Sequence, residues 1–308
     1  MNTETRILEP GQLETPPAEI RFLFLPKRDV FKRRAERLRL LSGNHTLGDY
    51  LNFLAMLADA QQVALDKLPA PSLPDSGEQM RCREHGIPPL NAASRRRDPA
   101  WRQGLTVVLK QMHGAALPSA ARDSVNSLMQ MSEAVLEGMA DNILTGKLSD
   151  ISPQELPFVA AGLQVSWVAM ASSLKEDAVG RLEHGGLCPV CGSHPGVGIV
   201  RINGQEQGLR YLSCSLCSSQ WHMVRLKCSI CESTEGIDYH TLEGSKVAVK
   251  TESCDKCNYY LKLLYLEKDP HMEATADDLA TLALDMLMDK EGKARGGPNL
   301  YFHPGKPH

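Results

Sequence analysis

The chain has 308 residues, of which 42% are hydrophobic and 23% charged, and its 34 Lys and Arg against 37 Asp and Glu give a formal charge of −3. The length allows two domains, or a larger one with small modules, and the balanced charge argues against a dedicated nucleic-acid binder, which carries a basic excess. Nine cysteines are the unusual feature of the composition.

The N-terminal residues lack the pattern of a secretory signal. Residues 1–5 are polar, and Pro10, Pro16 and Pro17 follow where a signal has a charged start and an apolar core. The most apolar stretch, 158–170, is shorter than the roughly 20 residues that a membrane-spanning helix needs. We therefore expect a cytoplasmic protein without membrane insertion, in which reduced thiols bind metal and do not form disulfides.

Residues 29–68 are predicted to form two helices joined by a tight turn. Apolar residues recur at helical spacing on both sides of Gly43, which interrupts the pattern. Thr46 and Asp49 resemble a capping box at the start of the second helix. The segment from about 69 to 99 is rich in proline, so we expect a long connection there and no regular element.

Helical periodicity resumes after this connection and continues to about residue 174. The periodic ranges are 101–116, 122–144 and 153–174. Pro118 and Gly146 lie between them as helix stops. We therefore expect residues 1–180 to form a helical domain, and the glycines within 177–187 to form a hinge that leads out of it.

Short segments that favour β-strands replace the helical pattern after Gly186. These segments are 197–203, 209–212, 221–227, 247–250 and 259–266, with turns at Gly204, Gly208 and Gly244. One more helix is predicted at 276–289, before a tail rich in glycine and proline. The expected units are a first module at 187–226, a second module at 227–268, and a C-terminal helix and tail at 269–308.

Eight of the nine cysteines lie in this β-rich part as four C-x-x-C pairs. The pairs are Cys188 with Cys191, Cys214 with Cys217, Cys228 with Cys231, and Cys254 with Cys257. The last two pairs repeat the spacing of the first two at an offset of 40 residues, which indicates a duplication. Two thiolates on such a tight turn point at one ion, and a second turn completes a tetrahedron.

The duplication favours two metal sites, one in each repeat. The first would use Cys188, Cys191, Cys214 and Cys217, and the second Cys228, Cys231, Cys254 and Cys257. Pairing of the two middle turns with each other remains an alternative. Gly192 eases the first turn, whereas Glu232 stands at the matching place in the second repeat.

The spacing alone leaves the metal and its role open. Four-sulfur sites suit zinc and iron alike, and two closed structural zinc ribbons are the simplest interpretation. Because four thiolates leave no open coordination position, metal-activated hydrolysis is not expected.

On these residues the chain resembles the FdhE-type accessory proteins of bacterial formate dehydrogenases. The resemblance covers the helical segments 31–41 and 47–61, the Cys188-Pro189-Val190-Cys191-Gly192 motif with the other three pairs, and residues 276–281. It implies a helical domain and paired rubredoxin-like modules, in a cytoplasmic protein that respiratory formate dehydrogenase needs for activity and that is not itself an enzyme.

The same resemblance implies cofactors and a partner. It implies iron at the eight paired cysteines, two ions per chain, with zinc as a substitute. It further implies transient binding to the catalytic subunit of formate dehydrogenase before that subunit is exported by the twin-arginine route.

The predicted fold class is therefore α+β and multidomain, with an N-terminal all-α domain, two tandem rubredoxin-like or zinc-ribbon-like modules, and a C-terminal helix. Two other functions remain open: a zinc-ribbon nucleic-acid-binding protein and an independent rubredoxin-like electron carrier. Residues 188–268 hold nine Lys and Arg against eight Asp and Glu, which supplies little attraction for phosphate.

The remaining candidate residues receive structural interpretations. Cys82, which forms a C-x-x-H with His85, is expected to be an unpaired loop cysteine. Asp277 and Asp278 are expected to cap the last helix, because acids are favoured in a first helical turn.

The basic residues and the histidines are likewise expected to be structural or solvated. The basic residues of 27–39, a theme that 95–97 repeat, could contact nucleic acid or an acidic partner, but their spacing favours a solvated helix face. His194, His222 and His240 are expected to be surface residues or neighbours of the ligands, since each site already has four sulfurs.

Overall fold

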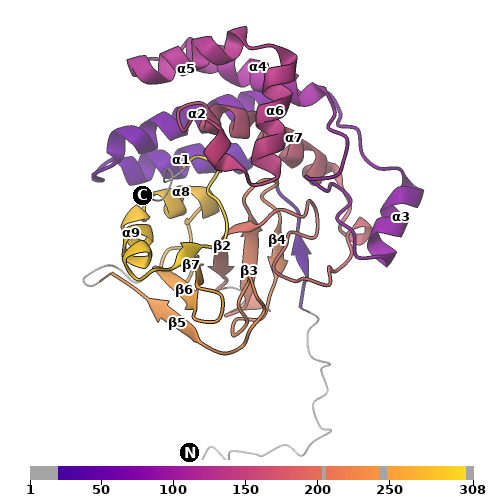
Figure 1. Ribbon diagram of the computed structural model, residues 1–308, viewed down its shortest axis with the longest axis vertical. Coiled ribbons are helices and arrows are strands. Elements are labelled where there is room, and N and C mark those ends of the chain that lie inside the picture. The colour runs from indigo at the N-terminus through magenta and orange to yellow at the C-terminus, as the bar shows by residue number, and fades with distance from the viewer. Residues whose placement is uncertain (1–19, 203–205, 243–247, 303–308) are drawn as a thin grey trace, which may run out of the picture.

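The computed structural model describes residues 20–202, 206–242 and 248–302, and it gathers most of the helices on one side of the molecule and the strands of a sheet on the other (Figure 1). Expectations for the N-terminal residues 1–19, for Gly204 and Gly244, and for the strand ends Asn203 and Val247 lie outside the described residues.

The helical layer is built around one central helix. The elements are α1 (Val30–Ser42), α2 (Gly48–Lys67), α3 (Ser76–Glu84), α4 (Ala100–His113), α5 (Ser119–Gln130), α6 (Glu133–Leu144) and α7 (Leu156–Ser173), with short 3-10 helices at Leu148–Asp150 and Glu176–Ala178. Helix α7 packs against α2, α4 and α6. Among the described residues it alone has the length and hydropathy to cross a membrane, yet 83% of it is buried inside the protein, as in the core helix of a helical layer.

The two-helix prediction for residues 29–68 is confirmed by α1 and α2, but three local expectations are wrong. Thr46 does not cap α2, which begins at Gly48 without a side-chain cap. The predicted helix 122–144 is two helices, because the Ser132 side chain accepts a hydrogen bond from the backbone of Val135 and starts α6 anew.

The third wrong expectation concerns the Pro-rich connection, which contains α3. Asp75 caps this helix by accepting a hydrogen bond from the backbone N of Glu78 at 2.8 Å. Helix α3 has no buried residue, so no apolar periodicity marks it in the sequence.

The strands of both repeats belong to one sheet. The strands of this sheet are β1 (Leu23–Phe24), β2 (Pro195–Val200), β3 (Arg210–Cys214), β4 (Gln220–His222), β5 (Ile237–His240), β6 (Val249–Cys254), β7 (Tyr259–Tyr265) and β8 (Ala294–Arg295), of which β1 and β8 lie outside the repeats. The order is β1-β4-β3-β2-β7-β6-β5, with β8 beside β7. Each repeat supplies three antiparallel strands, and parallel pairing of β2 with β7, in register Ile199 to Leu264, joins the repeats.

The predicted C-terminal helix is also two helices. Helix α8 (Ala274–Leu279) and helix α9 (Leu282–Lys290) are separated at Thr281, whose hydroxyl donates to the backbone carbonyls of Asp277 and Asp278. Helix α8 packs between α1 and the central strands β2 and β7. It therefore connects the helical layer with the sheet.

Buried ion pairs hold α8 against α1. Arg34 and Arg37 are only 2% and 9% exposed, and they pair with Glu273 at 3.1 Å and with Asp277 at 2.6 Å. The expectation that the basic residues of α1 form a solvated face is wrong for these two arginines. It overlooked the acidic partners, which follow more than 200 residues later in the chain.

Candidate metal centres

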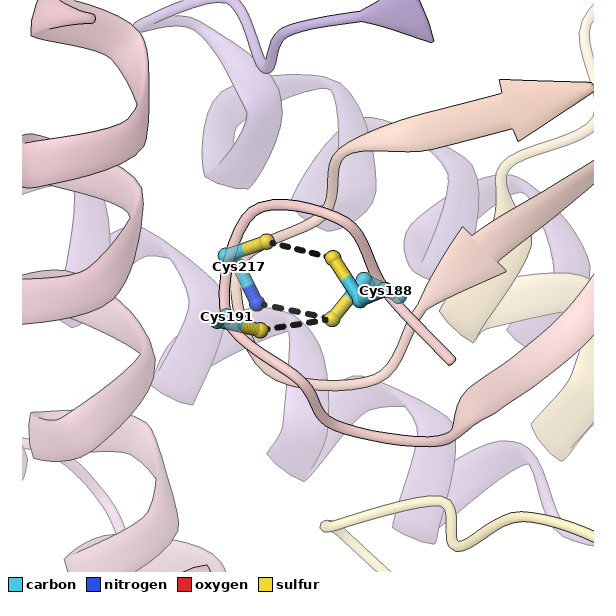
Figure 2. A group of neighbouring side chains, drawn as sticks. Cys188, Cys191 and Cys217 are labelled. Atoms are coloured by element: carbon cyan, nitrogen blue, oxygen red, sulfur yellow. Dashed lines mark hydrogen bonds between the residues drawn. The ribbon is translucent and has the colours of Figure 1, made fainter. Parts of the chain in front are cut away.

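The first centre is a compact group of four thiols between the helical layer and the sheet. The sulfurs of Cys188, Cys191, Cys214 and Cys217 all lie within 4.8 Å of one another, and all four residues are buried. The Sγ atoms of Cys188 and Cys217 are 3.6 Å apart, and those of Cys191 and Cys214 are 3.4 Å apart. Figure 2 shows the side chains of Cys188, Cys191 and Cys217 directed toward a common centre.

The second centre has the same arrangement in the second repeat. The sulfurs of Cys228, Cys231, Cys254 and Cys257 lie within 4.8 Å of one another. As in the first centre, the first cysteine lies near the last and the two inner ones lie near each other, with Sγ atoms 3.7 Å apart in each pair. The structure thus groups the thiols within each repeat and does not bring the two middle turns together.

These sulfur separations fit a tetrahedral ion. A zinc-sulfur bond of about 2.3 Å places the corners of a tetrahedron about 3.8 Å apart, close to the distances in both centres. Backbone N atoms support the thiolates: those of Leu216 and Cys217 donate to Sγ of Cys214, and that of Ile230 donates to Sγ of Cys228, each at 3.4 Å. The donor set therefore fits one metal ion in each centre.

Burial opposes ionisation of the thiols in both centres, yet hydrogen bonds from neighbouring thiols and backbone lower the pKa of Cys191 and of Cys231. Burial, with hydrogen bonds from the neighbouring thiols, holds the pKa of Cys188 well above its usual range. In the second centre burial is the largest cause that raises the pKa of Cys257 to about 12. A divalent cation reverses this preference, because it stabilises the thiolate directly.

Each C-x-x-C turn ends on a residue in the left-handed region. These residues are Gly192 (φ 76°), Ser218 (φ 58°), Glu232 (φ 59°) and Asn258 (φ 60°). Only glycine adopts this conformation without a steric cost. A glycine after the second cysteine therefore predicts the left-handed residue in the first turn alone, although all four turns end on a residue with positive φ.

The helical layer covers the first centre. Two backbone N atoms of the Pro-rich connection, those of Leu90 and Ala92, donate to the carbonyls of Val190 and Cys191 at 2.9 and 2.8 Å. From α7, Trp167 Nε1 donates to the carbonyl of Leu90 at 3.0 Å. The connection is thus part of the wall of the first centre.

The second centre is more open and has an acidic neighbour. Cys231 is exposed and Cys257 is half-buried. Hydrogen bonds from Lys227 and His184 lower the pKa of Glu232 to about 2. The spacing of the repeats marks position 232 only by the absence of a glycine, because the partner of Glu232, His184, lies outside the repeat.

The other candidate residues lie outside both four-cysteine groups. Cys82 is on α3, so its expected place in a loop is wrong, and burial raises its pKa. The cap of α8 is Glu273, whose side chain accepts hydrogen bonds from the backbone N atoms of Thr275 and Ala276, so the capping expectation for Asp277 is wrong; Asp277 instead accepts a hydrogen bond from the backbone N of Glu273 at 2.7 Å. Asp278 has a different role and forms a buried ion pair with Lys262 at 3.0 Å.

The three histidines supply no ligand to either group of thiols in the described part of the chain. The imidazole of His240 lies 2.9 Å from the hydroxyl of Ser253, and that of His222 contacts the ring of Tyr211 edge-on. His194 is exposed, and its backbone carbonyl accepts hydrogen bonds from Ser215.

Comparison with protein-family models finds three matches that together span most of the chain. The N-terminal, central and C-terminal domains of FdhE match residues 20–183, 187–225 and 226–302.

Curated relatives have the same name. A Pseudomonas aeruginosa protein named "Protein FdhE homolog" is 41% identical and covers 97% of this chain and 98% of its own length. "Protein FdhE" of Salmonella arizonae is 43% identical, over 92% of this chain and 91% of its own length. A solved structure, "The crystal structure of the FdhE protein from Pseudomonas aeruginosa", matches with a TM-score of 0.85 and 40% identity, and covers 93% of this chain and 100% of that one.

Proposed function

The chain belongs to the FdhE family, and we propose that it is an accessory protein in the maturation of respiratory formate dehydrogenase, with an iron ion in each four-cysteine centre. In this proposal it acts in the cytoplasm and binds the catalytic subunit transiently before export. It catalyses no reaction of its own. The observation that carries the proposal is the pair of preformed four-thiol groups on one sheet.

We propose iron on two grounds, the thiolate ligands and the resemblance to FdhE-type proteins. Zinc and iron both accept four thiolates, and the resemblance to FdhE-type proteins favours iron. Four sulfurs around an ion exclude water and substrate from it, so a bound iron supplies one-electron chemistry or structural cross-linking and no hydrolysis.

The two centres differ in access, which supports different tasks for them. The first is buried under α7 and the Pro-rich connection, whereas the second exposes Cys231. We assign to the first centre the structural task of joining the helical layer to the sheet. The exposed sulfur of the second centre would allow electron exchange, and this observation favours a rubredoxin-like electron carrier as the second candidate function.

The test is a pull-down of the formate dehydrogenase catalytic subunit with wild type, Cys188→Ala and Cys228→Ala, combined with assays of formate dehydrogenase activity and abundance in cells. We expect wild type to bind the subunit and both variants to lose binding and client activity. Loss of activity at unchanged client abundance indicates maturation, whereas loss of both indicates protection from degradation. Full binding and full client activity with both variants would remove the metal centres from the function.

A further inference from the structure

Segment 184–186 leads into the first centre while it is packed against the second. Gly186 precedes Cys188 by two residues and approaches the second centre so closely that an added Cβ would lie 1.8 Å from the carbonyl oxygen of Ser229, the residue after Cys228. The backbone of this segment therefore cannot shift without disturbing a ligand turn of one centre or the other.

Glu232 fastens this segment to the second centre. One carboxylate oxygen accepts a hydrogen bond from the backbone N of Gly185 at 2.7 Å and lies 2.7 Å from Nδ1 of His184. The other pairs with Nζ of Lys227 at 2.5 Å. Gly192 occupies the matching left-handed position of the first centre, so Glu232 carries a steric cost there that a glycine would avoid.

Segment 294–297 bridges the two centres a second time. A Cβ on Gly296 would lie 2.9 Å from Cδ1 of Ile230, inside the first ligand turn of the second centre. A Cβ on Gly297 would lie 1.8 Å from the carbonyl oxygen of Pro195, which follows the first ligand turn of the first centre. Consecutive glycines thus allow one segment to lie against a ligand turn of the second centre and against the start of β2, next to the first centre.

We propose that the two centres load metal cooperatively, because segment 184–186 leads into the first centre and packs against the second, and segment 294–297 contacts Ile230 in the second centre and Pro195 next to the first, with Glu232 as the residue that fixes segment 184–186. An ion in either centre holds its ligand turns in place, the turns hold the two segments, and the segments preorganise the other centre. By linkage the effect is reciprocal. This inference rests on the proposal that both centres bind metal.

The experiment is a Co²⁺ titration of the reduced, metal-free full chain against a competing chelator, followed by thiolate-cobalt absorption. Cys188→Ala and Cys231→Ala each retain one intact centre. We expect the second Co²⁺ to bind wild type about 5- to 150-fold more tightly than a single Co²⁺ binds either variant, the usual range for coupled sites.

Glu232→Gly tests the residue that carries the coupling. This variant removes the carboxylate and relieves the left-handed strain, so we expect it to bind two Co²⁺ with a several-fold smaller ratio. Ser218→Gly relieves the same strain in the first centre without touching segment 184–186, and we expect it to keep the wild-type ratio.

The outcomes separate the inference from the function on which it rests. Two Co²⁺ bound by wild type at the single-centre affinities overturn the coupling and leave the metal sites standing. An unchanged ratio in Glu232→Gly overturns the role of Glu232. Absence of Co²⁺ binding by wild type overturns both the metal sites and their coupling.

Discussion

At the scale of single residues, Gln164 connects α7 to the first centre. Its side chain is 2% exposed, Nε2 donates to the carbonyl of Ser215 at 2.8 Å, and Oε1 accepts from Nε2 of Gln61 at 3.0 Å. Ser215 lies between two cysteines of the centre. Gln164 therefore fixes the position of a ligand turn from the helical side.

We expect Gln164→Leu to lower the free energy of unfolding by about 1–3 kcal/mol, the cost of leaving a buried polar partner unpaired. Leucine has a similar size, so the loss reports the hydrogen bonds more than the packing. Gln111→Leu, on the exposed side of α4, is the control and should change stability by less than about 0.5 kcal/mol. Urea denaturation measures both, and equal losses would contradict the assigned role.

Residue spacing predicts the thiol groups but not their surroundings. The C-x-x-C spacing and the repeat together are enough to place four sulfurs in each group, since a tight turn fixes both thiols. Gln164 and Glu232 act through partners far along the chain, Ser215 and His184 respectively. No local pattern encodes such contacts, so sequence reasoning could not find them.

At the scale of elements, α1 contains neighbouring arginines with opposite environments. Arg34 is 2% exposed and contacts Glu273 and the hydroxyl of Tyr301, whereas Arg33 is exposed and pairs with Asp29, the residue just before α1. The basic run of α1 therefore contains both buried and exposed arginines. Of these two, the buried Arg34 attaches α1 to the C-terminal part of the chain, and the exposed Arg33 does not.

We expect Arg34→Ala to destabilise the protein by about 3–5 kcal/mol, because the carboxylate of Glu273, only 10% exposed, loses its ion-pair partner. The exposed pair at Arg33 contributes at most about 1 kcal/mol, so Arg33→Ala should have a small effect. Chemical denaturation of the two variants compares them directly. A similar loss in both would show that the pair between α1 and α8 does not hold the elements together.

Apolar periodicity predicts elements well where one face is buried and poorly elsewhere. Helices α1, α2 and α4 follow from it, since each buries apolar residues at helical spacing, whereas α7, within the predicted range 153–174, is buried on every side. Helix α3 buries none and was not predicted. The break between α5 and α6 depends on the cap at Ser132, a polar signal that periodicity does not weigh.

In the whole molecule, the two repeats form one sheet, and the helical layer and the first centre belong to one apolar core. The pairing of β2 with β7 makes one sheet from two repeats, and β1 brings the segment before α1 into that sheet beside β4. One apolar core contains residues of α2 and α7 together with cysteines of the first centre. The sequence predicts the helical and β-rich parts but not this shared sheet, because parallel pairing between repeats joins strands distant in the chain.

Each repeat is proposed to hold one metal ion. Metal analysis of protein purified from cells grown with ample iron tests it most directly, with Cys82→Ala as the control because Cys82 lies outside both four-cysteine groups. We predict two ions per chain in wild type and in Cys82→Ala, iron-thiolate charge-transfer absorption in both, and fewer ions in Cys188→Ala and Cys228→Ala. One ion or none in wild type would contradict the claim.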